Sequence, residues 1–238
     1  MIVLAIDTCD SRGSVAVLRD GAILGSVTHQ TAEDYSSWLL PAVNRVLREA
    51  GIRMEDVDAY AAASGPGSFT GVRVGLTTVK AWAEVYGKPI VGVSRLEAIA
   101  SQVSAATRYV AASANANRGQ VFGAIYRRNV TELERLGDEM VLTPGDFVAA
   151  AAESAGRESV SWVSIDPDCM LVDKTWQARE KLNESIEHVS PFLAQTIAGM
   201  AAGRSAAGHS TDALRLDANY VRRSDAEIFW KGGKTHGG

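Results

Sequence analysis

Few folds accommodate the order in which apolar runs and amphipathic stretches alternate at the start of the chain. Apolar runs at residues 2–6, 14–18 and 22–27 predict three strands, and the Asp20-Gly21 pair between the last two is a strong hairpin signal. A helix ending at Gly51 is predicted from about residue 39, because apolar residues recur at helical spacing. A strand at 57–64, a helix at 71–86 and a strand at 89–93 follow.

This β-β-β-α-β-α-β order is the ribonuclease H-like arrangement, and a degenerate copy of it is predicted in the second half. Strands are expected at residues 108–114, 120–126 and 160–165, with helices near 144–155 and 191–202. Two such units with mixed sheets make an α/β protein of the actin-like (ASKHA) fold. We expect an N-terminal unit at residues 1–100, a C-terminal unit at 101–230 and a disordered tail at 231–238.

Charge and cysteine content indicate which partners and which cellular compartment the chain has. The formal net charge of −4 disfavours direct RNA binding, because neutralisation of phosphates supplies most of such binding. Cys9 and Cys169 cannot form a disulfide framework, which favours a reduced compartment. The start of the chain lacks a basic signal-peptide region, and no apolar run approaches the ~20 residues that span a bilayer. We therefore expect a soluble, cytoplasmic protein without membrane contact.

The most specific segment lies between the predicted strand at 57–64 and the next helix. Residues 64–75 read SGPGSFTGVRVG, a loop that allows a tight backbone turn at the start of a helix. Backbone N–H groups at a helix start favour an anion. The segment is not a Walker A loop, since no lysine follows its last glycine, and Thr70 stands where a GxGxxG motif needs its third glycine. Both a structural turn and a phosphate cradle fit.

Together with Ala5-Ile6-Asp7-Thr8 near the start, this segment resembles the signature of the TsaB (YeaZ) family. Ser36 before Leu39-Leu40-Pro41 is similar to the first-helix pattern of that family. Gly92-Val93-Ser94 and the late Tyr220-Val221-Arg222 resemble it as well. Two positions depart from the family pattern: Tyr35 stands in place of a histidine, and Asn115 in place of an aspartate at the end of the first strand of the second unit.

The resemblance implies an actin-like subunit without catalytic activity of its own. Such proteins pair with TsaD, a larger paralogue that holds the metal and transfers the threonylcarbamoyl group to tRNA, and the small ATPase TsaE joins the assembly. The first two helices of the family pack on TsaD or, without it, on a second copy in a homodimer. The chain would then meet tRNA only through the complex. The residues expected at this interface are Ser36, Leu39, Leu40, Val43, Leu47, Arg73, Gly75, Leu76, Val79 and Trp82.

The cleft between the two units is expected to be a vestige of a nucleotide site. No cofactor or metal is expected there, although weak ATP or ADP binding is possible. Asp7 is interpreted as capping a turn, because the only carboxylates near it in sequence are Asp10, Glu33 and Asp34, and a two-metal site needs several. The residues assigned to this cleft are Asp7, Thr8, Gly65, Gly67, Ser68 and Asn115.

Two alternative functions remain open from the sequence. The first is an actin-like kinase or ATPase of a small metabolite, which would need carboxylates in both units. The second is a metallopeptidase, but the four histidines nowhere form an HxxxH or HExxH pair. Cys9 lacks a neighbouring base and is interpreted as a small packed residue. Trp38 and Trp82 are interpreted as packing or interface residues.

Overall fold

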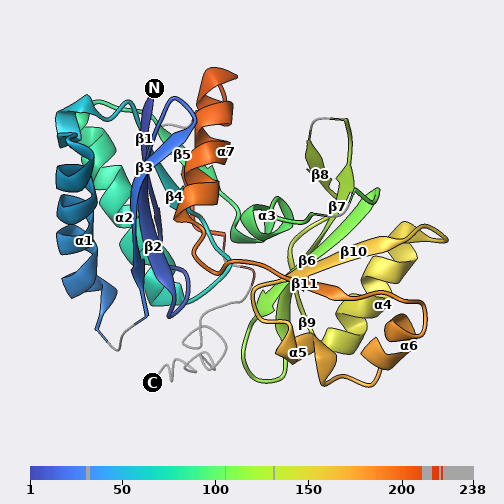
Figure 1. Ribbon diagram of the computed structural model, residues 1–238. Coiled ribbons are helices and arrows are strands. Elements are labelled where there is room, and N and C mark those ends of the chain that lie inside the picture. Colours follow the sequence, from blue (N-terminus) through green and yellow to red (C-terminus); the bar gives the residue numbers. More distant parts are fainter. Residues whose placement is uncertain (31–32, 105, 131, 211–215, 220, 222–238) are drawn as a thin grey trace, which may run out of the picture.

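Two mixed sheets and the helices that flank them form two units that meet along one junction (Figure 1). The computed structural model describes residues 1–238 except 31–32, 105, 131, 211–215, 220 and 222–238. The expected tail at 231–238 and two members of the late motif, Tyr220 and Arg222, lie outside the described residues.

The first sheet contains the five strands expected from the sequence. Its strands lie side by side in the order β3 (Ala22–His29), β2 (Gly13–Arg19), β1 (Ile2–Asp7), β4 (Ala59–Ala63) and β5 (Ile90–Val93). The first three strands form an antiparallel meander, whereas β4 runs parallel to β1 and to β5. A short 3-10 helix, Met54–Asp56, precedes β4. The three parallel strands therefore end at the same edge of the sheet.

Helices α1 (Tyr35–Ala50) and α2 (Phe69–Tyr86) cover one face of this sheet (Figure 1). The apolar stripe of α1 is buried, and the helix ends at Gly51, which adopts the left-handed conformation with φ 64° that favours glycine. The hydroxyl of Ser68 accepts a hydrogen bond from the backbone N–H of Gly71 and so caps the start of α2.

The second sheet repeats the pattern with shorter elements. Its strands lie in the order β11 (Ile186–His188), β10 (Val160–Ser164), β6 (Tyr109–Asn115), β7 (Val121–Arg128) and β8 (Leu133–Arg135), and β9 (Met140–Leu142) also pairs with β7. Helix α4 (Pro144–Ala155) packs against this sheet. Along the chain, the short helices α5 (Asp168–Leu171) and α6 (Trp176–Glu180) connect β10 to β11. The expectation of an α/β chain with two related mixed sheets is confirmed.

Each unit sends a helix to the other. Helix α3 (Arg95–Ala100) directly follows the first sheet but packs against β6 and β7 of the second. Helix α7 (Ala194–Ala206) follows the second sheet but returns to cover the free face of β1, β2, β4 and β5 (Figure 1). The spatial units therefore do not coincide with a division of the chain at residue 100, because burial of the second face of the first sheet requires α7. Ile197 and Ala198 of α7 are fully buried in this layer.

The position of α7 predicts that this helix stabilises the first sheet. Ile197→Ala should lower the free energy of unfolding by about 3 kcal/mol, because it leaves a cavity between α7 and the first sheet. The matched truncation Ile23→Ala, at a side chain that is 39% exposed on β3, should cost about 1 kcal/mol. Urea unfolding measures both values. Hydrogen exchange of Ile197→Ala should accelerate in β1 and β4, and acceleration confined to β6 and β10 would contradict the assignment.

Candidate functional site

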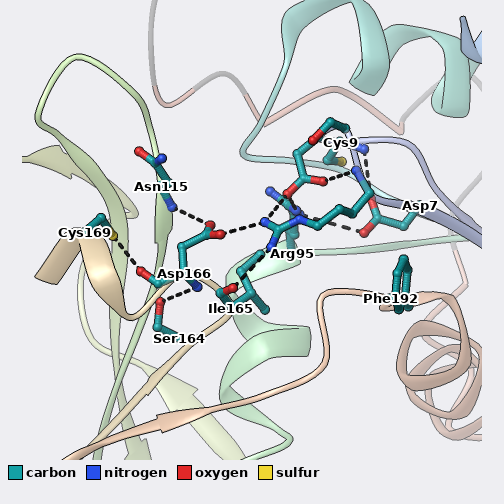
Figure 2. Close-up of polar contacts among 12 residues, drawn as sticks. Asp7, Cys9, Arg95, Asn115, Ser164, Ile165, Asp166, Cys169 and Phe192 are labelled. Carbon is teal, nitrogen blue, oxygen red and sulfur yellow. Dashed lines mark hydrogen bonds and ion pairs between the residues drawn. The ribbon is translucent and has the colours of Figure 1, made fainter. Parts of the chain in front are cut away.

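The junction between the two sheets brings together polar residues that lie far apart in sequence. Asp7 is the last residue of β1, Asn115 is the last residue of β6, and Asp166 follows β10 by two residues. Figure 2 shows Asp166 and Asn115 of the second unit on one side of Arg95, with Asp7 of the first unit on the other. The carboxyl ends of the central strands of both sheets therefore face one another across this junction.

Arg95, the first residue of α3, is the buried cation at the centre of the junction. Its side chain is 2% exposed, and its Nη2 donates to Oδ2 of Asp10. Its Nε lies 3.8 Å from Oδ2 of Asp7, which is within ion-pair distance but too long for a hydrogen bond. The other oxygen of Asp7 accepts a 2.9 Å hydrogen bond from the backbone N–H of Cys9. The prediction that Asp7 caps a turn is confirmed, and its charge is also compensated by Arg95.

A second arginine connects the two units directly. Arg12 donates from Nη2 to Oδ2 of Asp10 at 2.9 Å and to Oδ1 of Asp166 at 2.8 Å. Its Nη1 also donates to the backbone carbonyl of Ile165 at 3.3 Å. Oδ2 of Asp166 in turn accepts a 2.9 Å hydrogen bond from the backbone N–H of Asn115. Each of the carboxylates Asp7, Asp10 and Asp166 is thus within ion-pair distance of an arginine.

Burial and these arginines shift the acidities in opposite directions. Burial raises the pKa of Asp7, and the nearby charge of Arg95 only partly offsets it. Burial also raises the pKa of Asp10, but the charge of Arg95 and the hydrogen bonds from Arg12 outweigh it, so this pKa lies below its usual value. Burial alone would lower the pKa of Arg95, and the charges of Asp7 and Asp10 raise it instead. Asp10 is therefore the carboxylate that the two arginines hold ionised.

The glycine-rich loop packs tightly on the end of β1. A Cβ atom at Gly67 would collide with the backbone carbonyl of Cys9, and one at Gly71 would collide with that of Thr8. The backbone N–H of Ser68 donates to the carbonyl of Cys9 at 2.6 Å. These close approaches account for the glycines as a structural turn, which was one of the two interpretations open from the sequence.

The remaining cleft residues also have local structural roles. The hydroxyl of Thr8 donates a 2.6 Å hydrogen bond to the carbonyl of Gly71. Gly65 has a φ of +107°, where a side chain would be strained, and it lies against the backbone of Asn219. The side chain of Asn115 accepts a 2.7 Å hydrogen bond from the backbone N–H of Asn117, which makes an Asx turn.

The surroundings of Cys9 favour the protonated thiol. Cys9 is fully buried, and burial and the charge of Asp7 raise the pKa of its thiol well above the usual value. Within the described ranges, no group of three or more His, Cys, Asp or Glu residues is placed to hold a metal ion. Glu33 and Asp34 are exposed at the start of α1. The interpretation of Cys9 as a packed residue is confirmed.

The structure corrects the expected partner surface. The buried members of the expected surface are at most 5% exposed and belong to the core of the chain: Leu39, Val43, Leu47, Leu76 and Val79. Gly75 is buried as well, because a Cβ there would lie 2.6 Å from Oγ1 of Thr8 on the sheet side of α2. Helical spacing correctly predicts that these residues share one face of α1 or of α2, but that face of each helix points toward the chain's own sheet. A substitution at Gly75 would therefore disturb folding rather than association alone.

The outer face of α1 and α2 holds the rest of the expected surface and a shallow groove. Ser36 and Arg73 are exposed, and Leu40 is 53% exposed. The guanidinium of Arg73 stacks 3.6 Å above the ring of Phe69. Trp82 is half-buried, with its ring 5.7 Å from that of Tyr60. The groove has a volume of about 390 Å³ and is lined by Tyr35, Ser36, Leu39, Leu40, Arg73, Val74, Thr77 and Thr78.

Sequence reasoning did not find the central residues of the junction, Arg12, Arg95 and Asp166. One signal was available for Arg95. It opens a short helix whose other residues are apolar except Glu97, and a lone arginine in such a stretch indicates a buried ion pair. Nothing local in the sequence marks Arg12 or Asp166, because their contact joins positions 154 residues apart.

Comparison with known proteins gives a family match over most of the chain. The family described as "TsaD: tRNA N6-adenosine threonylcarbamoyltransferase" matches residues 22–211. The chain belongs to this family. The relatives named below place it with the TsaB (YeaZ) members, as the sequence resemblance indicated.

The similar proteins include "tRNA threonylcarbamoyladenosine biosynthesis protein TsaB" from Bacillus subtilis and from Escherichia coli. The B. subtilis protein is 29% identical over 64% of this chain and 67% of its own length. The E. coli protein is 36% identical over 54% of this chain and 56% of its own length. The matched segments thus span about half to two thirds of these curated relatives.

Solved structures agree over a longer stretch. "YeaZ from Pseudomonas aeruginosa" has a TM-score of 0.69 and 26% identity, covering 92% of this chain and 99% of that one. The ethanolamine utilization protein EutJ from Carboxydothermus hydrogenoformans has a TM-score of 0.50 and 11% identity, over 84% of this chain and 89% of that one, and shares the fold alone. The expectation of an actin-like fold is confirmed.

The lowered pKa of Asp10 predicts a pH-dependent contribution to stability. Asp10→Asn should lower the free energy of unfolding by about 3 kcal/mol near neutral pH, because it breaks a largely buried ion pair. The contribution of the carboxylate is present above the unfolded pKa of about 3.9 and is lost as pH falls through the lower folded pKa. Urea unfolding should therefore show a smaller difference between wild type and variant at about pH 3 than at about pH 7.

Asp20→Asn is the matched control for this measurement. Asp20 is exposed, and its hydrogen bond and ion pair with the chain's amino terminus lower its pKa. Solvent screens this pair, so the variant should change stability only slightly at any pH. An equal loss in both variants would show that the buried location of Asp10 contributes nothing.

Proposed function

We propose that the chain is a non-catalytic scaffold and activator subunit of the complex that forms N6-threonylcarbamoyladenosine in tRNA, where it binds a TsaD-like catalytic subunit. One observation carries the proposal: Asp10 and Asp166 of the junction are paired with Arg95 or Arg12, and Asp7 lies within ion-pair distance of Arg95. A kinase or ATPase would need carboxylates available for metal ions in the same place. The arginines therefore weigh against the alternative of a small-metabolite kinase.

The outer face of α1 and α2 supports a docking role. Leu40 lines the groove with half of its side chain exposed, and Val85 near the end of α2 is 74% exposed. An apolar groove between two helices suits a helix from a partner, which would bury these side chains on association. The TsaB-named relatives and the match to the TsaD family support a TsaD-like subunit as the partner that binds this groove.

The remaining parts of the proposal concern the assembly. A TsaE-like ATPase joins the complex, and in isolation a second copy of the chain occupies the same groove. The negative net charge favours contact with tRNA through the complex rather than directly. Weak ATP or ADP binding at the cleft and a cytoplasmic location belong to the same proposal. Where the structure describes helices, none is long and apolar enough to cross a membrane.

Reconstitution tests the proposed division of labour. The purified chain with ATP, Mg²⁺, threonine, bicarbonate and tRNA should produce no modified adenosine, and addition of a TsaD-like subunit with the other components of the pathway should restore it. Mass spectrometry of nucleosides from digested tRNA measures the product. Modification by the chain alone, in a preparation free of host enzymes, would overturn the scaffold assignment.

A charge placed in the groove should separate association from folding. Leu40→Asp puts a carboxylate at a position that a docked partner would bury, and an unpaired buried charge costs several kcal/mol. We expect affinity for the TsaD-like subunit to fall about a hundredfold, a penalty of about 3 kcal/mol, with an unchanged melting temperature. Leu171→Asp, at a similarly exposed leucine of α5, is the matched control and should bind normally. Full-strength binding by Leu40→Asp would place the interface elsewhere.

A further inference from the structure

Tyr35, the first residue of α1, touches both the groove and the junction. Its side chain lines the groove between α1 and α2. Its hydroxyl donates a 2.5 Å hydrogen bond to the backbone carbonyl of Asp10, in the turn between β1 and β2. One side chain therefore spans from the proposed docking surface to the turn that carries the ionic network.

The turn that Tyr35 holds is the one that ties the two units together. The side chain of Asp10 accepts hydrogen bonds from Arg95 and Arg12, and its Oδ1 also accepts from the backbone N–H of Arg12 at 2.6 Å. Arg12 continues to Asp166 of the second unit at 2.8 Å. The groove is thus connected to the second unit through Tyr35, Asp10, Arg12 and Asp166 in succession.

Packing leaves the ring of Tyr35 little freedom to absorb a movement. A Cβ atom at Gly13 would lie 2.5 Å from the hydroxyl oxygen of Tyr35, so the phenol rests directly on the backbone at the start of β2. The rings of His29 and Trp38 lie 4.7 Å and 5.9 Å away. A displacement of the ring by a molecule in the groove would consequently be passed to the Asp10 turn.

We propose that Tyr35 is a positioning residue that couples occupation of the α1–α2 groove to the Arg12–Asp166 ion pair between the units. A partner bound in the groove and the state of that ion pair then influence each other by the same factor, because coupling free energies are reciprocal. Asp166 therefore affects partner affinity although it does not line the groove. This rests on the proposed function, since the occupant of the groove is taken to be a TsaD-like subunit.

A double-mutant cycle on binding tests the coupling. Asp166→Asn should change the dissociation constant for a TsaD-like subunit about fivefold in the wild-type background and less than twofold in the Tyr35→Phe background. Tyr35→Phe keeps the ring on Gly13 and removes only the hydroxyl that reaches Asp10. The double-mutant cycle subtracts any direct effect of Tyr35→Phe on binding in the groove. Asp138→Asn, at an exposed carboxylate of the second unit, is the matched control and should leave affinity unchanged in both backgrounds. Equal effects of Asp166→Asn in the two backgrounds would overturn the inference.

A measurement on the isolated chain separates this inference from the proposed function. With fluorotryptophan incorporated, the ¹⁹F resonance of Trp38, beside Tyr35, should shift in Asp166→Asn but not when Tyr35→Phe is also present. Melting curves confirm that each variant is folded. Absence of binding to a TsaD-like subunit together with this shift would reject the proposed partner and support the link from Tyr35 to Asp166. A Trp38 resonance that does not respond to Asp166→Asn, or responds equally in both backgrounds, would reject the link.

Discussion

The guanidinium of Arg95 is almost completely removed from solvent, and such a charge is tolerated inside a protein only where carboxylates and hydrogen bonds compensate it. The carboxylates that do so, Asp7 and Asp10, both belong to the end of β1 and the turn after it. Because Arg95 is also the first residue of α3, and α3 packs on the second sheet, this pairing fixes where the second sheet lies against the first. The rest of the junction is built on that position.

This arrangement assigns different tasks to the two ends of the first unit. Contacts within the chain fill the edge of the sheet where β1 and β4 end. The glycine-rich loop packs against Cys9, and Arg12 pairs with Asp166. The outer face of α1 and α2 keeps exposed apolar side chains such as Leu40. The first unit thus carries an ionic network at the edge of its sheet and exposed apolar side chains on its flank.

The sequence predicted the first unit well because its elements are long and strongly patterned. The Asp20-Gly21 turn and the periodicity around Val43 are local signals, and neither depends on distant contacts. The strands β8, β9 and β11 span three residues each and exist because a neighbouring strand pairs with them, which no periodicity records. The second unit was consequently predicted only in outline.

The candidate site was harder to predict for two physical reasons. Helical spacing shows which residues share a face but not whether that face points inward, so Val43 and Gly75 were assigned to the surface that Leu40 occupies. The network itself depends on contacts across the whole chain, such as Arg12 with Asp166, and these are properties of the assembled fold. Asp7 was identified from its place at the end of a strand, whereas its arginine partner was not.

The exchange of helices between the two units also orders events during synthesis. When β5 has left the ribosome, one face of the first sheet is still bare, because the helix that covers it starts at Ala194, after residues 94–193 have been made. At ~5–20 residues per second this interval lasts roughly 5–20 s. The second sheet, in turn, needs α3 from the segment that follows the first. The first sheet therefore cannot complete its core until α7 has been made, whereas α3 is already present when the strands of the second sheet emerge.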